Sequence, residues 1–189
     1  MLKRILLIAS LAIGLMINSS GQTRRTTVAS RRVSAKAFAY FEEVKDQSLA
    51  DYLKCIRPKR LSPAHRAQVI AFLPKEGEVQ PSAKGWAKLA ALEPIFSYHD
   101  RSGAIEIRVI AVGHAFVGLH ARSVLLVSEE ALDLLTTEEL QAAAAHEMGH
   151  DYFWNEYQLA REYKRYEEMQ ELELRCDGVA IIAMTSLGR

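Results

Sequence analysis

The segment His146-Glu147-Met148-Gly149-His150 holds the residue types best able to do chemistry in this chain. A helix turns about 100° per residue, so two histidines four residues apart lie on one face, one turn apart. Both imidazoles can then bind one Zn²⁺, while Glu147 beside them can take a proton from a water that the metal activates. Gly149 leaves the helix surface open to another segment. The spacing predicts one zinc ion per chain with its own catalytic base.

The residues before this motif favour a buried helix over a chance match on a surface helix. Leu140 and the four alanines that end at Ala145 are small or apolar, as in a packed helix. Polar side chains that close a buried helix need partners, since unpaired buried polar groups are costly. We therefore expect the two histidines and Glu147 to be functional.

A third metal ligand must come from elsewhere, because catalytic zinc usually takes three protein ligands and a water. Glu173 and Asp177 are four residues apart and would share a helix face. We expect Glu173 to bind the metal. We expect Asp177 to accept a hydrogen bond from a ligand histidine and so orient its ring. Glu171 is the alternative ligand, and a solvated acidic face with Glu167 and Glu168 is the alternative interpretation.

We do not expect His114, His120 or Cys176 to bind the metal. His114 and His120 are isolated histidines near loops, which usually face solvent or form hydrogen bonds. Cys176 points about 60° away from Glu173 around the helix and is expected to be a small core residue. An exported chain permits a disulfide between Cys55 and Cys176, but the sequence does not show that they are close.

The surrounding pattern predicts an α+β fold, mainly helical, with a small sheet beside the zinc-binding helix. Helices are expected at 34–55, from an N-cap at Ser62 and Pro63 through residue 73, at 83–92 closed by Pro94, from Thr136 or Thr137 through the motif, at 155–166 and at 171–184. Strands are expected at Tyr98, 105–110 and 123–128, with a turn at 100–103. The zinc would lie between two of the helices.

Residues 124–140, running into the motif, resemble the HtpX-like and CAAX prenyl endopeptidase family of gluzincin metallopeptidases. That family has a strand, a short helix ending in Leu-Leu, a Thr/Ser-x-Glu-Leu helix start and then H-E-x-x-H. Its third ligand comes from Glu-x-x-x-Asp, matched here by Glu173 and Asp177. The resemblance covers residues 105 to 187 and implies a zincin-like domain with zinc endopeptidase activity.

The same family has an Asn-Ala-Phe segment before the strand, and His114-Ala115-Phe116 resembles it, with His114 in place of the asparagine. Metallopeptidases of this kind bind substrate as an extra strand along a sheet edge beside the zinc. The resemblance therefore implies a substrate edge within residues 113–118, with an ordinary loop as the alternative. Four residues remain open as the donor that stabilises the oxyanion: Tyr163, Tyr166, Arg175 and His114.

The N-terminus carries a targeting pattern. Lys3 and Arg4 precede an uncharged run at 5–17, which is shorter than the roughly twenty residues of a membrane span. Small residues follow it. This predicts a signal peptide at 1–21 and an exported protein, periplasmic or secreted, with an uncleaved membrane anchor as the alternative.

Three segments are therefore expected: the signal peptide, a flexible basic leader at 22–33 that could touch a membrane surface peripherally, and one metallopeptidase-like domain at 34–189 with its motif core at 105–187. The formal net charge of +1 gives no argument for a nucleic-acid partner. The expected function is an exported zinc endopeptidase that cleaves polypeptides, for instance in envelope protein quality control. The alternatives are an inactive peptide-binding pseudo-protease or chaperone, and a compact regulatory protease of the ImmA type.

Overall fold

The computed structural model describes residues 48–75 and 77–189. The expected signal peptide, the basic leader and the helical pattern at 34–47 lie outside the described residues. The elements, in order, are α2 (Leu49–Cys55), α3 (Pro63–Ala71), α4 (Ala83–Ala90), α5 (Glu93–Tyr98), β1 (Glu106–Ile110), β2 (Val117–His120), β3 (Val124–Ser128), α6 (Glu129–Leu134), α7 (Thr137–Tyr152), α8 (Trp154–Glu162) and α9 (Tyr166–Ser186). The expected α+β class is confirmed. Within the described part of the chain, no helix is both long and apolar enough to span a membrane.

The sheet is mixed, with strand order β1-β3-β2. Strand β1 runs parallel to β3, and β2 runs antiparallel to it. Residues 77–79 cover part of the outer edge of β1, where the Val79 amide donates to the Val109 carbonyl. Strand β2 therefore forms the opposite edge of the sheet.

Every second residue of strand β2 has its backbone N–H and C=O groups pointing away from β3. The Ser128 amide donates to the Phe116 carbonyl, which makes residues 116 and 128 a hydrogen-bonded pair. Bonded and non-bonded pairs alternate in an antiparallel ladder. The backbone N–H and C=O groups of Val117 and Leu119 therefore point outward from the sheet.

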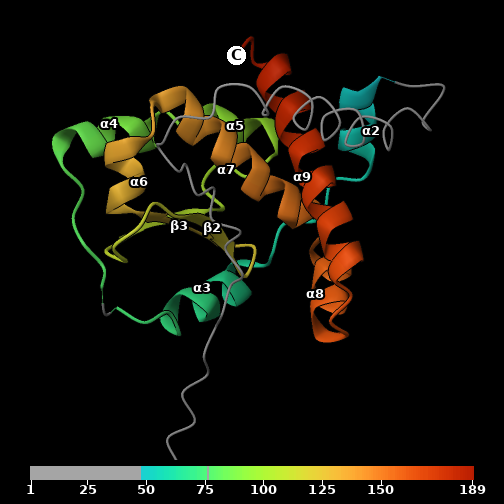
Figure 1. Ribbon diagram of the computed structural model, residues 1–189, viewed down its shortest axis with the longest axis horizontal. Helices are drawn as coiled ribbons and strands as arrows, with labels where there is room; N and C mark the ends of the chain where they lie inside the picture. Colours follow the sequence, from blue (N-terminus) through green and yellow to red (C-terminus); the bar gives the residue numbers. More distant parts are fainter. Residues whose placement is uncertain (1–47, 76) are drawn as a thin grey trace, which may run out of the picture.

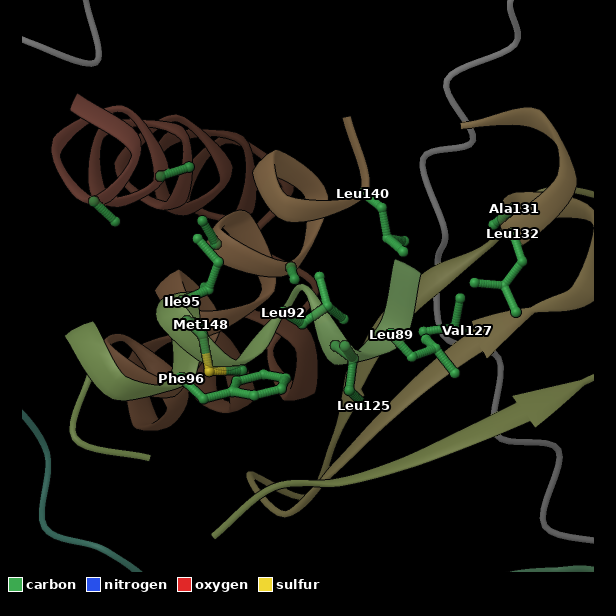
Figure 2. Close-up of a cluster of buried hydrophobic side chains, with 14 of the residues drawn as sticks. Leu89, Leu92, Ile95, Phe96, Leu125, Val127, Ala131, Leu132, Leu140 and Met148 are labelled. Atoms are coloured by element: carbon green, nitrogen blue, oxygen red, sulfur yellow. The ribbon is translucent and has the colours of Figure 1, made fainter. Parts of the chain in front are cut away.

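The main hydrophobic core lies between the sheet and the helices above it in Figure 1, whereas α3 lies on the opposite side of the sheet. Leu140, Ala144 and Met148 follow one another at four-residue spacing on α7 and are fully buried, as the sequence predicted for this helix. Figure 2 shows how α4, α5, β3, α6 and α7 fill a common interior, with the labelled side chains Leu89, Leu92, Ile95, Phe96, Leu125, Val127, Ala131, Leu132, Leu140 and Met148.

Helix α9 packs directly on α7 and belongs to two cores. Its Ala180 and Ala183 contact the main core, whereas Cys176 and Val179 belong to a second cluster with residues of α2 and α8. A Cβ atom on Gly149 would lie only 2.6 Å from the Cα atom of Cys176. The glycine thus permits the close approach that the sequence predicted, and Cys176 is the small core residue expected.

The two cysteines lie in different environments: Cys176 is buried and Cys55 is exposed, and no disulfide joins them.

Two predicted N-caps are confirmed. The Ser62 side chain caps α3 at the His65 amide, with Pro63 at the first helical position. The side chain of Thr136 accepts from the Glu139 amide, while Glu139 reaches back to the Thr136 amide, which completes a capping box at the start of α7.

The prediction of a strand at Tyr98 is wrong, because Tyr98 is the last residue of α5. Pro94 does not merely close the preceding helix; it occupies the first turn of the next one, where its missing N–H costs no hydrogen bond. The boundary between the last two helices also differs from the prediction. Lys164 adopts a positive φ of 54°, which ends α8 early and lets α9 begin at Tyr166.

Candidate metal centre

Helix α7 carries the motif on its final turns. The rings of His146 and His150 lie with centroids 5.2 Å apart, edge to face. The ligand atoms of His146, Glu147 and His150 all lie within 4.8 Å of one another. Among the described residues, this cluster includes neither His114 nor His120. The three side chains together could hold a metal ion.

Glu173 of α9 reaches the same point from the other side. Its Oε2 atom is 3.2 Å from Nε2 of His146 and 3.5 Å from Nε2 of His150. Glu171, the alternative ligand, is exposed on the same helix. The crossing of α7 and α9 therefore brings Glu173 to both histidines and leaves Glu171 facing solvent.

Asp177 contacts the far side of the first histidine. Its Oδ1 atom is 2.8 Å from Nδ1 of His146. A ring N–H directed at this carboxylate leaves Nε2 facing Glu173. Asp177 thus lies where a residue that orients the ring of His146 must lie.

The two acidic side chains make the site attractive to positive charge. Burial alone would lower the pKa of His146, but the hydrogen bonds to Asp177 and Glu173 outweigh it and raise that pKa to about 10. Burial alone would raise the pKa of Glu173, but its bonds to His146 and His150 lower it to about 2. The carboxylate of Glu173 is therefore ionised at neutral pH.

Glu147 points toward the sheet edge. Its Oε2 atom accepts a 2.8 Å hydrogen bond from the backbone N–H of Leu119, one of the outward-facing groups of β2. Burial raises the pKa of Glu147, although the nearby charges of His150 and His146 oppose the shift. A carboxylate with a raised pKa is a better proton acceptor. The candidate base is thus adjacent to the edge strand.

Tyr157 of α8 is a site residue that the sequence did not reveal. Its ring packs edge-on against His150, with centroids 5.0 Å apart, and its hydroxyl interacts with the carboxylate of Glu173. Burial, followed by the charge of Glu173, raises the pKa of Tyr157 to about 12, so the hydroxyl keeps its proton at neutral pH. Tyr157 follows His150 by seven residues, a spacing that places two residues on one face of a continuous helix. The chain breaks the helix at Phe153, between α7 and α8, so this spacing alone did not predict the contact.

The four candidates for the oxyanion donor are exposed or only partly buried. Tyr163 and Tyr166, at the α8–α9 connection, are 61% and 64% exposed. The guanidinium of Arg175 lies 5.8 Å from the ring centroid of Phe153. His114 is exposed in a loop, where its Nδ1 atom is 3.1 Å from the Val112 carbonyl. Among the described residues, His114 is not part of the histidine–carboxylate cluster.

The edge strand of the sheet lies further along the chain than the predicted substrate edge. The strand begins at Val117, and His114 and Ala115 precede it in a loop. Phe116 extends the pairing by one residue, since its carbonyl accepts from the Ser128 amide. Its ring lies over Gly118, where an added Cβ would be 2.5 Å from the ring. Only the second half of the predicted segment, with Leu119 and His120 added, forms the edge.

Comparisons of the chain with models of protein families, with curated proteins and with solved structures found no match. The resemblance of the motif region to the HtpX-like family therefore stays a hypothesis. The chemistry of this chain is accordingly inferred from the geometry of its histidine–carboxylate cluster.

Proposed function

We propose that this chain is a zinc-dependent endopeptidase, with His146, His150 and Glu173 as the metal ligands. Tetrahedral ligands bound to zinc at about 2.0–2.2 Å lie roughly 3.3–3.6 Å from one another. The Glu173 oxygen lies 3.2 Å and 3.5 Å from the two histidine nitrogens, a separation that fits such a site. Two histidines and one glutamate are also a donor set of hydrolytic zinc sites. This convergence is the observation that carries the proposal.

Two further side chains would hold these ligands in place. Asp177 would orient the ring of His146, and the protonated hydroxyl of Tyr157 would donate to the carboxylate of Glu173. Hydrogen bonds of this kind fix ligand geometry and raise ligand basicity. These contacts come from α8 and α9, the two helices that follow the motif.

Bound zinc would supply a Lewis acid that activates water and polarises a peptide carbonyl. Glu147 takes the proton from the attacking water and then delivers it to the leaving amine. The Leu119 amide holds one carboxylate oxygen of Glu147, which leaves the other oxygen to act on the proton. The raised pKa of Glu147 favours its uptake of that proton.

The substrate class follows from the edge strand. An extended polypeptide can pair with the outward backbone groups of Val117 and Leu119, adding a strand beside Glu147. This proposal agrees with the motif resemblance, since β3, the short helix α6 and the helix start at Thr136 follow the family's order. The targeting pattern at 1–21 supports an exported protein acting on envelope polypeptides.

The test compares the full chain with its Glu147→Gln variant, using zinc content and cleavage of an unfolded protein such as casein. Glu147→Gln should keep one zinc per chain, because Glu147 is not a proposed ligand, and should lose about 10²-fold or more of the activity. Glu171→Gln, an exposed carboxylate on α9, is the matched control and should retain both.

The outcomes separate the alternatives. Wild-type protein without stoichiometric zinc would refute the ligand assignment. Zinc bound at one per chain, with peptide binding but no cleavage of any substrate, would instead identify a peptide-binding pseudo-protease. Equal activity in wild type and Glu147→Gln would show that Glu147 is not the base.

A further inference from the structure

Asp151 immediately follows the second histidine of the motif and is buried, with 3% of its side chain exposed. It accepts hydrogen bonds from two arginines that are far away in the sequence. Nε of Arg101 lies 2.8 Å from Oδ2, and Nε of Arg122 lies 2.5 Å from Oδ1. Asp151 itself is not part of the cluster of His146, Glu147 and His150.

Arg122 lies in the tight turn that joins β2 to β3. The Ser123 amide donates to the His120 carbonyl across this turn, and both central residues have positive φ, 45° for Ala121 and 58° for Arg122. Such turns normally use asparagine or glycine, because other residues are strained in the left-handed region. Strain of this kind persists where surrounding contacts enforce it.

The contacts of Arg122 provide that enforcement. Besides Asp151, its guanidinium donates to the Lys59 carbonyl at 2.9 Å. Arg101 similarly donates to the Pro58 carbonyl at 2.6 Å. One buried carboxylate thus links the end of α7, the hairpin turn and the segment that precedes α3.

Helix α7 and the hairpin are consequently joined at two points. Glu147 accepts from the Leu119 amide, and Asp151 accepts from Arg122. Glu147 and Asp151 are one helical turn apart and share a face of α7. Two contacts along one face fix both the distance and the angle between the helix and the edge strand, which a single contact cannot do.

We propose that the Arg122–Asp151 pair is a positioning device, which holds the β2 edge against α7 so that a paired peptide meets Glu147 in a fixed register. The consequence for cleavage rests on the proposed function, whereas the mechanical link between hairpin and helix does not. Arg122 is a positioning residue, since it acts through β2 and the Leu119 amide.

Arg122 is the better residue to change, because Asp151 keeps its bond to Arg101 when Arg122 is removed. Asp151 is then not left as an unpaired buried charge, the state that destabilises most. Arg122→Gln should therefore release the hairpin while the fold persists. Arg108→Gln is the matched control, since Arg108 lies on β1, away from β2 across the sheet, and pairs with Glu78 and Glu106.

The first readout is amide hydrogen exchange of the full chain, followed in peptides that cover residues 117–120. Arg122→Gln should speed exchange there at least tenfold, and Arg108→Gln should leave it unchanged. Arg122→Lys, which keeps a positive charge for Asp151, should lie closer to wild type than to Arg122→Gln. Wild-type exchange in Arg122→Gln, equal acceleration in Arg108→Gln, or Arg122→Lys as fast as Arg122→Gln would each overturn the proposal.

The second readout uses zinc and peptide cleavage. Zinc affinity of Arg122→Gln should stay within about threefold of wild type, since the ligands lie on α7 and α9, while kcat/KM for an unfolded substrate should fall at least tenfold. A loss of zinc together with activity would mean that Arg122 acts on the metal site as a whole, against the proposal. If wild type cleaves nothing, the proposed function fails, but the exchange data still decide the link itself.

Discussion

Nδ1 of His146 lies 2.8 Å from Oδ1 of Asp177, so a carboxylate of α9 orients a ring carried by α7. Only one ring nitrogen of a histidine can face a metal while the other donates to a neighbour. The contact with Asp177 selects Nε2 for the side that Glu173 occupies. The relative position of two helices thereby decides the geometry of a single ligand.

Removing this contact should weaken metal binding without unfolding the protein. The Asp177 side chain is 44% exposed, so Asp177→Ala leaves no buried cavity. We expect zinc affinity to fall about 10–100-fold, the usual effect of deleting a hydrogen-bond partner of a metal ligand. Competition titration with a chromophoric chelator measures this. Glu171→Ala, on the exposed face of the same helix, should bind zinc like wild type, and equal affinity in Asp177→Ala would rule out the orienting role.

The substitution Tyr157→Phe tests the hydroxyl of Tyr157 alone, because it removes that group and keeps the ring. The ring can still pack against His150, but the interaction of the hydroxyl with Glu173 is lost. Zinc affinity should fall by up to about tenfold, and the free energy of unfolding of the metal-free protein should change by about 1 kcal/mol or less. Tyr163→Phe, which changes an exposed tyrosine beyond the end of α8, is the control. A Tyr157→Phe protein with unchanged affinity would show that the hydroxyl does not support the ligand.

Gly149→Ala tests the crossing of α7 and α9. Alanine normally stabilises a helix interior by about 1 kcal/mol relative to glycine. Here the new Cβ would lie 2.6 Å from the Cα atom of Cys176, a backbone atom that cannot rotate away. We therefore expect the opposite sign, a loss of at least about 2 kcal/mol from overpacking, together with weaker zinc binding. Urea denaturation measures the first effect.

The matched reverse change is Ala142→Gly, at an exposed position of the same helix. It should cost about 1 kcal/mol through helix propensity alone, with no effect on zinc. If Gly149→Ala is as stable as wild type or more so, then the two helices do not cross as closely as the contact with Cys176 implies.

The sequence predicts those parts of the site that depend on one helix or on short spacings. Helix periodicity places His146 beside His150 and Glu173 beside Asp177 without knowledge of the fold. The cap at Thr136 is equally local, since the capping box spans only four residues. Even the close approach at Gly149 could be anticipated, although its partner could not.

The remaining features depend on contacts between distant residues. Arg122 and Asp151 are 29 positions apart, and no periodicity connects them. Pro94 was ambiguous because proline both ends a helix and begins the next one. The position of the edge strand depends on which residues pair with β3, and a register is decided by the whole sheet and its core. Tyr157 contacts His150 only because of the angle between α7 and α8, which the local sequence pattern does not reveal.

A buried histidine away from the metal cluster makes stability depend on pH. His99 is 1% exposed, and its Nδ1 atom is 3.1 Å from the hydroxyl of Tyr152. Burial, and then the charges of Arg57 and Arg101, lower the pKa of His99 to about 3. In the unfolded chain a histidine is protonated near pH 6.5. Below that pH the unfolded state binds a proton at His99 that the folded state does not bind.

The difference between the folded and unfolded pKa of His99 determines the pH range in which stability changes and the direction of the change. Above about pH 6.5 His99 is neutral in both states, so its contribution to stability is fully present. Between about pH 6.5 and 3 the free energy of unfolding should fall by about 1.4 kcal/mol per pH unit on account of this group, or about 2 kcal/mol at pH 5.0. His99→Asn, which can still bond to Tyr152 but does not titrate, should lose that much less stability than wild type between pH 7.5 and 5.0. Urea denaturation of both metal-free proteins at the two pH values measures the difference, and equal losses would show that His99 becomes protonated in the folded protein.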